Sequence, residues 1–392
     1  MMKRLFNRRK LTVLGINSGT SADGIDLAVI NLSKTGQSLT VKYDTGKTIS
    51  YPKKIKSALE NAITDYQISA EQTTRLDIAY GDYLGKAARQ FIDSEKLKID
   101  LIASHGQTLF HFPHKEKTLL TKSAATIQIG DGNALAAASG LPVVSDFRRA
   151  DIALGGEGAP LTPFVNRILF GDKTKSRIIV NIGGIANYSY HPAGGKIDDI
   201  KGGDCGPGNT LVDNACRLLV NKPYDRDGRI ASKGIILPEV VAVVIEANHR
   251  NSVSTGRKLF DRELLARAVH AAGGLRAEKK DIVASLTYAT ARLIYERIKK
   301  LLSDRKLEAV YLAGGGRKNK FLVKQLADLC QPMEILPVDK LGYNGDLLEA
   351  VSFAVLGARF VYNFPSTLPG VTGAVDKGGV AGKLALPPIK KR

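Results

Sequence analysis

Short apolar runs and longer helical stretches alternate along most of the chain. The first ordered segment predicts a β-hairpin, in which strands over 11–17 and 25–32 flank a polar turn over 18–24. Further strand signal follows over 39–43 and 48–51. The later predicted strands are short apolar runs that end in polar loops, over 99–103, 127–130, 141–145, 178–182, 309–312 and 333–337.

Apolar residues at helical spacing predict helices between these strands. Ile282, Leu286, Ala289 and Leu293, for example, mark one face of a helix. The predicted helices cover 52–65, 70–98, 133–139, 161–170, 211–220, 279–302, 318–330 and 346–362, with mainly helical structure over 223–274 that a polar stretch at 251–256 interrupts. Alternating strands and helices indicate an α/β protein, and the opening hairpin indicates mixed rather than purely parallel sheets.

The length of 392 residues favours two domains. We expect an N-terminal α/β domain over 1–140 and a C-terminal α/β domain over 141–363. The Gly- and Pro-rich tail, 364–392, is expected to pack back on the first domain. Polar, glycine-rich sequence repeatedly follows a strand, and in open α/β sheets this carboxyl edge is where ligands bind.

Composition excludes a mostly disordered chain, because 44% of the residues are hydrophobic and 24% are charged. The charge is basic: 57 Lys and Arg against 38 Asp and Glu give +19. Nucleic-acid binding would favour concentrated basic stripes with interleaved aromatic residues. Here the basic residues are spread out, so a solvated basic surface is favoured, with nucleic acid as the minor alternative.

The cysteine count and the lack of long apolar runs indicate a cytoplasmic protein. Cys205, Cys216 and Cys330 form no CxxC pair, which is typical of a reducing compartment. Apolar runs all fall short of the roughly 18 residues that a membrane span needs. The basic start, 1–10, lacks the apolar core of a secretory signal. We therefore expect neither a membrane nor a nucleic-acid partner.

Three glycine-rich loops at strand ends suggest a nucleotide held in a cleft between two domains. Glycines allow a phosphate to approach the backbone, whose N–H groups then contact its oxygens. A nearby carboxylate, Asp26, would hold Mg²⁺ through water. Each loop alone is equally an ordinary tight turn, and none matches the Walker or GxGxxG pattern. The candidate nucleotide-binding residues are Gly19, Thr20, Ser21, Ala22, Asp23, Gly24, Ile25, Asp26, Gly183, Gly184, Gly314, Gly315, Gly316 and Asn319.

A fourth motif, Gly203–Asn209, places one carboxylate, Asp204, among glycines and a proline in what we expect to be a stiff loop. Such a loop presents a base to a ligand, although a rigid turn before a helix cap explains it too. The neighbouring Cys205 is expected to be a small buried residue rather than a nucleophile.

Histidine and arginine at strand ends have structural alternatives. His105 is more often a hydrogen-bonded structural residue than a base, and its spacing to His111 and His114 fits no standard zinc pattern. Arg148 is suited to bind a carboxylate or phosphate, or to pair with Asp146 or Asp151. Glu349 either reaches the ligand or faces solvent.

Taken in order along the chain, these motifs resemble the anhydro-N-acetylmuramic acid kinase family. The resemblance covers residues from 11 to about 386. It is carried by 14–26, 104–108, 128–131, 145–148, 155–160, 181–187, 204–209, 224–228, 254–257, 314–316 and 369–374.

The resemblance implies a two-domain actin/hexokinase-like fold and an ATP-dependent, Mg²⁺-dependent reaction. Water opens the 1,6-anhydro bridge of 1,6-anhydro-N-acetylmuramic acid, and O6 takes the γ-phosphoryl group. By matching position, Asp204 is the base that activates water, and Arg148, Glu349 and Asn181 belong to the sugar site. The family also suggests a homodimer.

Some residues depart from the family pattern and leave alternatives open. Asn17 stands where the muramyl kinases usually have Met and where the related levoglucosan kinases have Asn. Gly203 and Cys205 replace the usual Phe and Thr. A levoglucosan-type anhydrohexose kinase is therefore the close alternative, and a non-catalytic sugar or nucleotide sensor on the same fold is the outside one.

Overall fold

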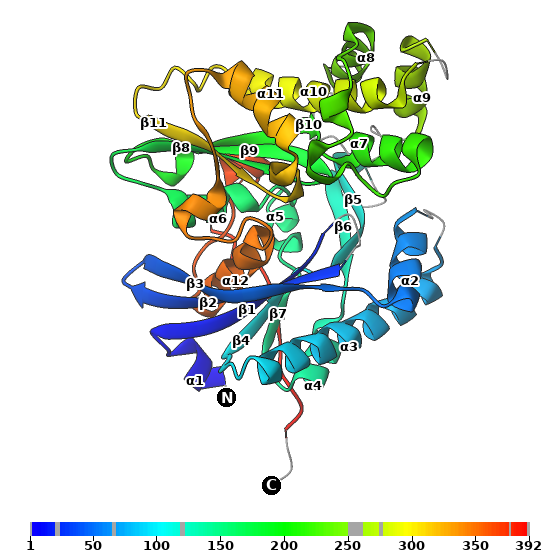
Figure 1. Cartoon of the computed structure of the whole chain (residues 1–392). Helices are drawn as coiled ribbons and strands as arrows, with labels where there is room; N and C mark the ends of the chain where they lie inside the picture. The colour runs from blue at the N-terminus through cyan, green and yellow to red at the C-terminus, as the bar shows by residue number, and fades with distance from the viewer. Residues whose placement is uncertain are drawn as a thin grey trace. The chain divides into compact units, whose positions relative to one another are not determined.

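The computed structural model describes residues 2–19, 24–64, 68–117, 122–249, 262–273, 277–375 and 378–389. The chain forms two compact units: unit 1 contains Met1–Leu169 and Leu347–Arg392, and unit 2 contains Phe170–Asp346 (Figure 1). The boundaries expected at 140 and 363 both fall inside unit 1. The reason is that β7 (Val143–Ser145) pairs with β4 in the sheet of unit 1, and α12 (Leu348–Val361) packs on that sheet.

The main sheet of unit 1 has the strand order β13-β7-β4-β1-β2-β3. Its central strand, β1, pairs antiparallel with β2 and parallel with β4. The tail adds β13, which pairs antiparallel with β7 at the edge. The strands of this unit are β1 (Lys10–Ser18), β2 (Gly24–Thr35), β3 (Ser38–Ser50), β4 (Leu101–Ser104), β7, β13 (Lys383–Ala385), and the separate hairpin β5 (Gln107–Lys117) and β6 (Lys122–Ile129).

Helices cover both faces of this sheet. Leu14 and Ile16 of β1 are buried against α3, whereas Gly15 between them lies against Ala350 of α12 on the opposite face (Figure 1). The capping box of Ser69 and Gln72 starts α3. The helices are α1 (Met2–Phe6), α2 (Lys53–Thr64), α3 (Ala70–Ser94), α4 (Gly132–Ser139), α5 (Arg149–Ala153), α6 (Thr162–Phe170), α12 and α13 (Pro369–Thr372).

Unit 2 is built on a five-stranded sheet of order β10-β9-β8-β11-β12. Its strands are β8 (Ser176–Ile182), β9 (Ile185–His191), β10 (Lys201–Pro207), β11 (Leu307–Ala313) and β12 (Ile335–Pro337). Apolar residues of β8 and β11 pack against α10 and α11 (Figure 1). The helices are α7 (Thr210–Ala215), α8 (Pro238–His249), α9 (Arg262–Ala271), α10 (Lys279–Ile298) and α11 (Lys320–Cys330).

Each unit repeats one topology. In both sheets a central strand begins an antiparallel meander of three strands, and two further strands then add parallel on its other side. This duplicated arrangement of mixed sheets is that of the actin/hexokinase-like fold class. The fold class predicted from the sequence is therefore confirmed.

Several element predictions were wrong in detail. Strands β5, β9, β10 and β13 had not been predicted, and the two strands expected over 39–51 are the single strand β3. The helix expected over 211–220 changes at Cys216 into a wider π-helical turn. The segment from 223 was expected to be mainly helical. Its first α-helix begins only at Pro238, after two short 3-10 turns. The interruption expected at 251–256 lies outside the described residues.

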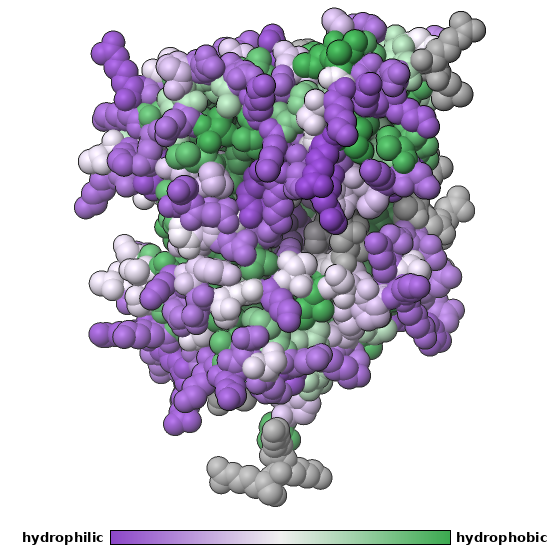
Figure 2. Space-filling model, in the orientation of Figure 1, coloured by the Kyte–Doolittle hydropathy of each residue, from purple (hydrophilic) through white to green (hydrophobic). Residues whose placement is uncertain are grey.

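The surface is mostly polar where Figure 2 shows it. Hydrophilic side chains cover most of that face, and hydrophobic ones form separate spots. Exposed large apolar side chains, among them Ile78, Phe112 and Ile235, come from different parts of the chain. Across the described ranges, every helix is too short or too polar to cross a membrane.

Candidate active site

The first predicted phosphate loop joins β1 to β2. Thr20, Ser21, Ala22 and Asp23 lie outside the described residues, as do residues 254–257. Gly19 follows β1, and Gly24 opens β2 where a side chain would meet the Ile49 carbonyl oxygen at 2.4 Å. Ile25 is fully buried, so its side chain belongs to the core of unit 1. Asp26 accepts a 2.6 Å hydrogen bond from the Thr48 hydroxyl.

A buried chain of hydroxyl groups supports the base of this loop. The Ser18 hydroxyl lies 2.6 Å from the Tyr51 hydroxyl and donates to the Gln107 side chain. Tyr51 continues the chain to the hydroxyl of Tyr80. Burial raises the pKa of Tyr51 to about 12, so this chain stays neutral at physiological pH. The end of β1 is therefore held by a network with no net charge.

Arg148 and Glu349 each have an anchoring partner within unit 1. The Asn17 amide donates to Glu349 Oε2 at 2.8 Å. Arg148 Nε donates to His105 Nε2 at 3.0 Å, and its Nη1 donates to the Gly158 carbonyl at 2.9 Å. Burial lowers the pKa of Arg148 to about 10, an effect that Glu349 opposes, so the guanidinium remains charged at neutral pH.

The ion pair of Arg148 with Asp146, which the sequence offered as an alternative, does not form among the described residues, because both side chains have other partners. Among the described residues, Asp146 pairs with Arg149 and Lys383. Asp151, fully buried, accepts hydrogen bonds from the Gly158 backbone and the Thr372 hydroxyl at 2.8 and 2.7 Å. Asp151 thus ties the tail to the loop that holds Arg148, rather than forming a direct ion pair with it.

In unit 2, Gly183 and Gly184 form the tight turn between β8 and β9. Their carbonyl groups accept hydrogen bonds from the backbone N–H groups of Asn209 and Gly208, at 2.8 and 2.9 Å. The Thr210 hydroxyl also donates to Gly184. This turn and the segment that opens α7 are consequently one structure, although they are distant in sequence.

The glycine run after β11 lies against the end of β8. Gly314 has a φ of +76°, and a side chain there would come within 2.6 Å of Asn181 Oδ1. Gly316 lies against Ile182, leaving no room for a side chain. Asn319 caps α11 by accepting from the Leu322 N–H. The structure thus brings Asn181, Gly314 and Gly316 together, whereas Asn319 has a structural role.

Arg317 clamps this glycine loop and had no predicted role. Its side chain is only 10% exposed and bonds Asp346 at 2.6 Å, Asp339 at 3.1 Å and the Gly314 carbonyl at 3.1 Å. The Gly345 carbonyl accepts a 3.0 Å hydrogen bond from the Gly314 N–H. The carboxylates are distant in sequence, so nothing in a local pattern predicts this contact.

We expect Arg317→Ala to raise the KM for ATP about tenfold. Without the guanidinium, the Gly314 carbonyl is no longer linked to Asp339 and Asp346, and the glycine loop loses its fixed position. Loss of the partly buried ion pairs would also cost about 1–3 kcal/mol of the free energy of unfolding. Steady-state kinetics and urea unfolding measure both. Arg75→Ala, which removes an exposed pair with Glu71, is the matched control and should change neither. Lower stability with an unchanged KM for ATP would show that this loop does not contact the nucleotide.

Asp204 lies in a strand, not in the loop expected from the sequence. Within β10 it pairs with Asn187 of β9, and a β-bulge follows at Cys205, between Asp204 and Gly206, whose φ is +139°. Cys205 is buried as predicted, and burial raises the pKa of its thiol. The bulge turns the chain directly after the carboxylate.

Two helices fix the segment that follows Asp204. The Asn248 amide of α8 donates to the Cys205 carbonyl at 3.3 Å. The Thr290 hydroxyl of α10 donates to the Gly208 carbonyl at 3.2 Å. Asp204, which is partly exposed, is therefore followed directly by backbone that two helices hold in place.

Comparison with known proteins identifies the relatives of this chain. The model of the family described as anhydro-N-acetylmuramic acid kinase matches residues 11–383. The chain belongs to the anhydro-N-acetylmuramic acid kinase family. An anhydro-N-acetylmuramic acid kinase of Salinibacter ruber is 33% identical over 98% of both chains. One of Francisella tularensis subsp. novicida is 35% identical over 93% of this chain and 96% of the relative.

Solved structures resemble the chain more distantly. An activator of 2-hydroxyisocaproyl-CoA dehydratase from Clostridium difficile, with bound ADPNP, has a TM-score of 0.43 and 12% identity, covering 90% of this chain and 96% of that one. A likeness this low adds nothing to the family assignment.

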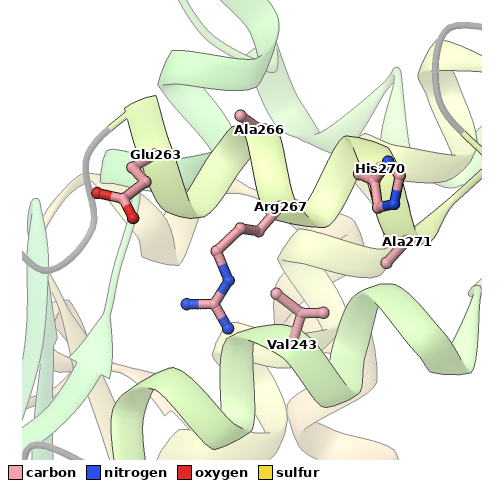
Figure 3. Close-up of a pocket in the computed structure, with 6 residues that line it drawn as sticks. All are labelled: Val243, Glu263, Ala266, Arg267, His270 and Ala271. Carbon is pink, nitrogen blue, oxygen red and sulfur yellow. The ribbon is translucent and has the colours of Figure 1, made fainter.

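Unit 2 of this family member also has a shallow depression of about 480 Å³ between α8 and α9, lined by Val243, Glu263, Ala266, Arg267, His270 and Ala271. Arg267 extends from α9 towards α8, and His270 lies farther along the same helix (Figure 3). The predicted site residues all lie elsewhere.

Proposed function

We propose that this chain is an ATP-dependent anhydro-N-acetylmuramic acid kinase. Water attacks the anomeric carbon of 1,6-anhydro-N-acetylmuramic acid, the internal bridge opens, and O6 takes the γ-phosphoryl group of ATP. The product is N-acetylmuramic acid 6-phosphate, as required for peptidoglycan recycling. The observation that carries this proposal is the family match over 11–383.

Asp204 is proposed as the general base. Hydrolysis at an anomeric carbon needs a carboxylate that deprotonates water on the face opposite the leaving oxygen, as in inverting glycosidases. The second carboxylic acid of those enzymes is dispensable here, because O6 leaves towards an electrophilic phosphorus. The support for Asp204 is its partly exposed carboxylate on a strand that Asn248 and Thr290 hold in place.

The glycine-rich segments are proposed to bind ATP. Backbone N–H groups between Gly19 and Asp26 would contact the phosphates, and the turn at Gly183–Gly184 and the run Gly314–Gly316 would contact the rest of the nucleotide. Close packing at Gly24, Gly314 and Gly316 leaves these backbones bare of side chains, which supports this role.

Mg²⁺ is proposed to bind at Asp26. Among the described residues, no three His, Cys, Asp or Glu side chains form a metal-binding group. A single carboxylate suits Mg²⁺ in nucleotide sites, since the ion keeps several waters and takes phosphate oxygens as ligands. The partly exposed carboxylate of Asp26 at the start of β2 fits this use. The ion would neutralise charge on the transferred phosphoryl group.

Arg148, Glu349 and Asn181 are proposed to bind the sugar. Arg148 and Glu349 are oppositely charged and are each oriented by a neighbour, His105 and Asn17. Such preorganised groups bind a polar ligand without first losing side-chain freedom. We place the reaction in the cytoplasm, where ATP is available and the three free cysteines stay reduced. The homodimer remains a prediction, testable by light scattering.

The test is ATP-dependent turnover of 1,6-anhydro-N-acetylmuramic acid beside levoglucosan, with ADP release and the sugar phosphate measured by mass spectrometry. We expect the muramyl sugar to be strongly preferred. Preference for levoglucosan would keep the chemistry and contradict the proposed substrate. Turnover of neither sugar, with ATP still bound, would contradict the kinase proposal and favour a sensor.

A further inference from the structure

Arg148 is held by two of its three guanidinium nitrogens. Nε donates to His105 Nε2 and Nη1 donates to the Gly158 carbonyl, at 3.0 and 2.9 Å. Within the described part of the chain, these bonds leave Nη2 without a hydrogen-bond partner. Of the five N–H donors of the guanidinium these bonds use two, so both N–H groups of Nη2 and one of Nη1 remain for a ligand.

His105 has a single tautomer in this arrangement. Its Nδ1 lies 3.1 Å from the Gly106 carbonyl, which can only accept, so Nδ1 carries the proton. Nε2 must then be unprotonated, because it accepts from Arg148. Burial, and next the charge of Arg148, hold the pKa of His105 well below its usual value. The ring is consequently a neutral acceptor.

The packing around His105 keeps this acceptor in place. The side chain is 8% exposed, and its ring stacks on Phe353 of α12 with centroids 4.4 Å apart. With one nitrogen bonded to Gly106 and the other to Arg148, neither is available to exchange a proton with substrate. These contacts exclude a general-base role and point to orientation of Arg148.

We propose that His105 is a positioning residue that acts on the sugar through Arg148. The neutral imidazole fixes the guanidinium so that Nη2 is presented to an anionic or polar oxygen of the substrate. This inference rests on the proposed function, in which Arg148 contacts the sugar. It assigns a use to the Ser104–Thr108 motif that the sequence alone left as structural.

Two substitutions of His105 separate the effect of its hydrogen-bond acceptor from the effect of its aromatic ring. His105→Phe keeps stacking on Phe353 and removes the acceptor, whereas His105→Gln supplies an acceptor near Nε2 and removes the ring. We expect His105→Phe to raise the KM for the sugar about tenfold, with kcat and the KM for ATP nearly unchanged. His105→Gln should recover most of the loss. A wild-type KM in His105→Phe, or equal loss in both variants, would overturn the proposal.

A double-mutant cycle tests whether His105 acts through Arg148. In an Arg148→Gln background, His105→Phe should raise the KM for the sugar no further, since the group that it orients is gone. Independent, multiplicative effects would show that His105 acts by another route. Thermal unfolding of each variant identifies any that simply fail to fold.

A spectroscopic measurement separates this proposal from the proposed function. In ¹⁵N spectra of the wild-type protein, His105 should stay neutral with Nδ1 protonated from pH 5 to 8. The Arg148 Nε–H signal should be protected from exchange and lose this protection in His105→Phe. Titration of His105 in that range, or an unprotected Nε–H, would overturn the positioning role. Absence of sugar turnover by the wild-type protein would instead contradict the proposed function.

Discussion

Replacing Asp204 by Asn should lower kcat by about 10²–10⁴-fold, the range typical of a lost general base, and leave the affinity for ATP unchanged. Asn has nearly the same shape as Asp, so the pairing of Asp204 with Asn187 and the following bulge should persist. What disappears is the ability to take a proton from water. Sugar turnover and calorimetric ATP binding, measured on the same preparation, separate the two effects.

Asp199→Asn is the matched control for this experiment. Asp199 is an exposed carboxylate shortly before β10 and accepts a backbone hydrogen bond from Lys196. Its replacement should leave turnover within about twofold, as for surface substitutions in general. Turnover close to wild type in Asp204→Asn would remove Asp204 from the catalytic role. Loss of ATP binding in that variant would indicate disruption of the site rather than loss of a base.

Strong local patterns predicted most of the elements that form the two sheets and their covering helices. The opening hairpin was expected over 11–32, and β1 and β2 occupy that region. The helix expected over 279–302 is α10, because its apolar faces pack on both the sheet and the helices of unit 2. Here local propensity and tertiary packing favour the same structure.

The strand that carries Asp204, β10, was missed because it contains residues with weak strand propensity. β10 includes two glycines before Asp204, and another glycine and a proline after Cys205, a composition typical of loops. Pairing with β9 outweighs this composition, since β10 gains backbone hydrogen bonds along its length. The bulge at Cys205 accommodates the irregular part. The sequence pattern therefore drew attention to the carboxylate as a candidate but did not predict the element that carries it.

The candidate site shows a similar division. Glycines and charged residues became candidates from motifs, because those residue types have few uses at strand ends. Their partners were not, since the bonds of Asn17 to Glu349, of His105 to Arg148 and of Arg317 to Asp346 join distant segments. Such contacts depend on the tertiary fold, and a single sequence contains no local signal for them.

The largest stability effect is expected for Gly15→Ala. Gly15 lies in the central strand of unit 1, and an added Cβ would come within 1.9 Å of the Ala350 carbonyl oxygen and 3.0 Å of the Ala354 side chain. Both belong to α12, whose backbone cannot yield without leaving the sheet. Overpacking of cores usually costs 1–3 kcal/mol, and contact with backbone places this variant at or above about 3 kcal/mol. Urea unfolding followed by circular dichroism measures the loss.

The same substitution should also affect the candidate site. A shift of α12 would lengthen the 2.8 Å bond between Asn17 and Glu349, because these residues follow Gly15 and precede Ala350 on the two packed elements. We therefore expect a higher KM for the sugar in any folded fraction. Gly370→Ala is the control: its Cβ would meet no atom within 4 Å, and stability should change by less than about 0.5 kcal/mol. Equal stability of the two variants would show that β1 and α12 are not packed as tightly as their backbones indicate.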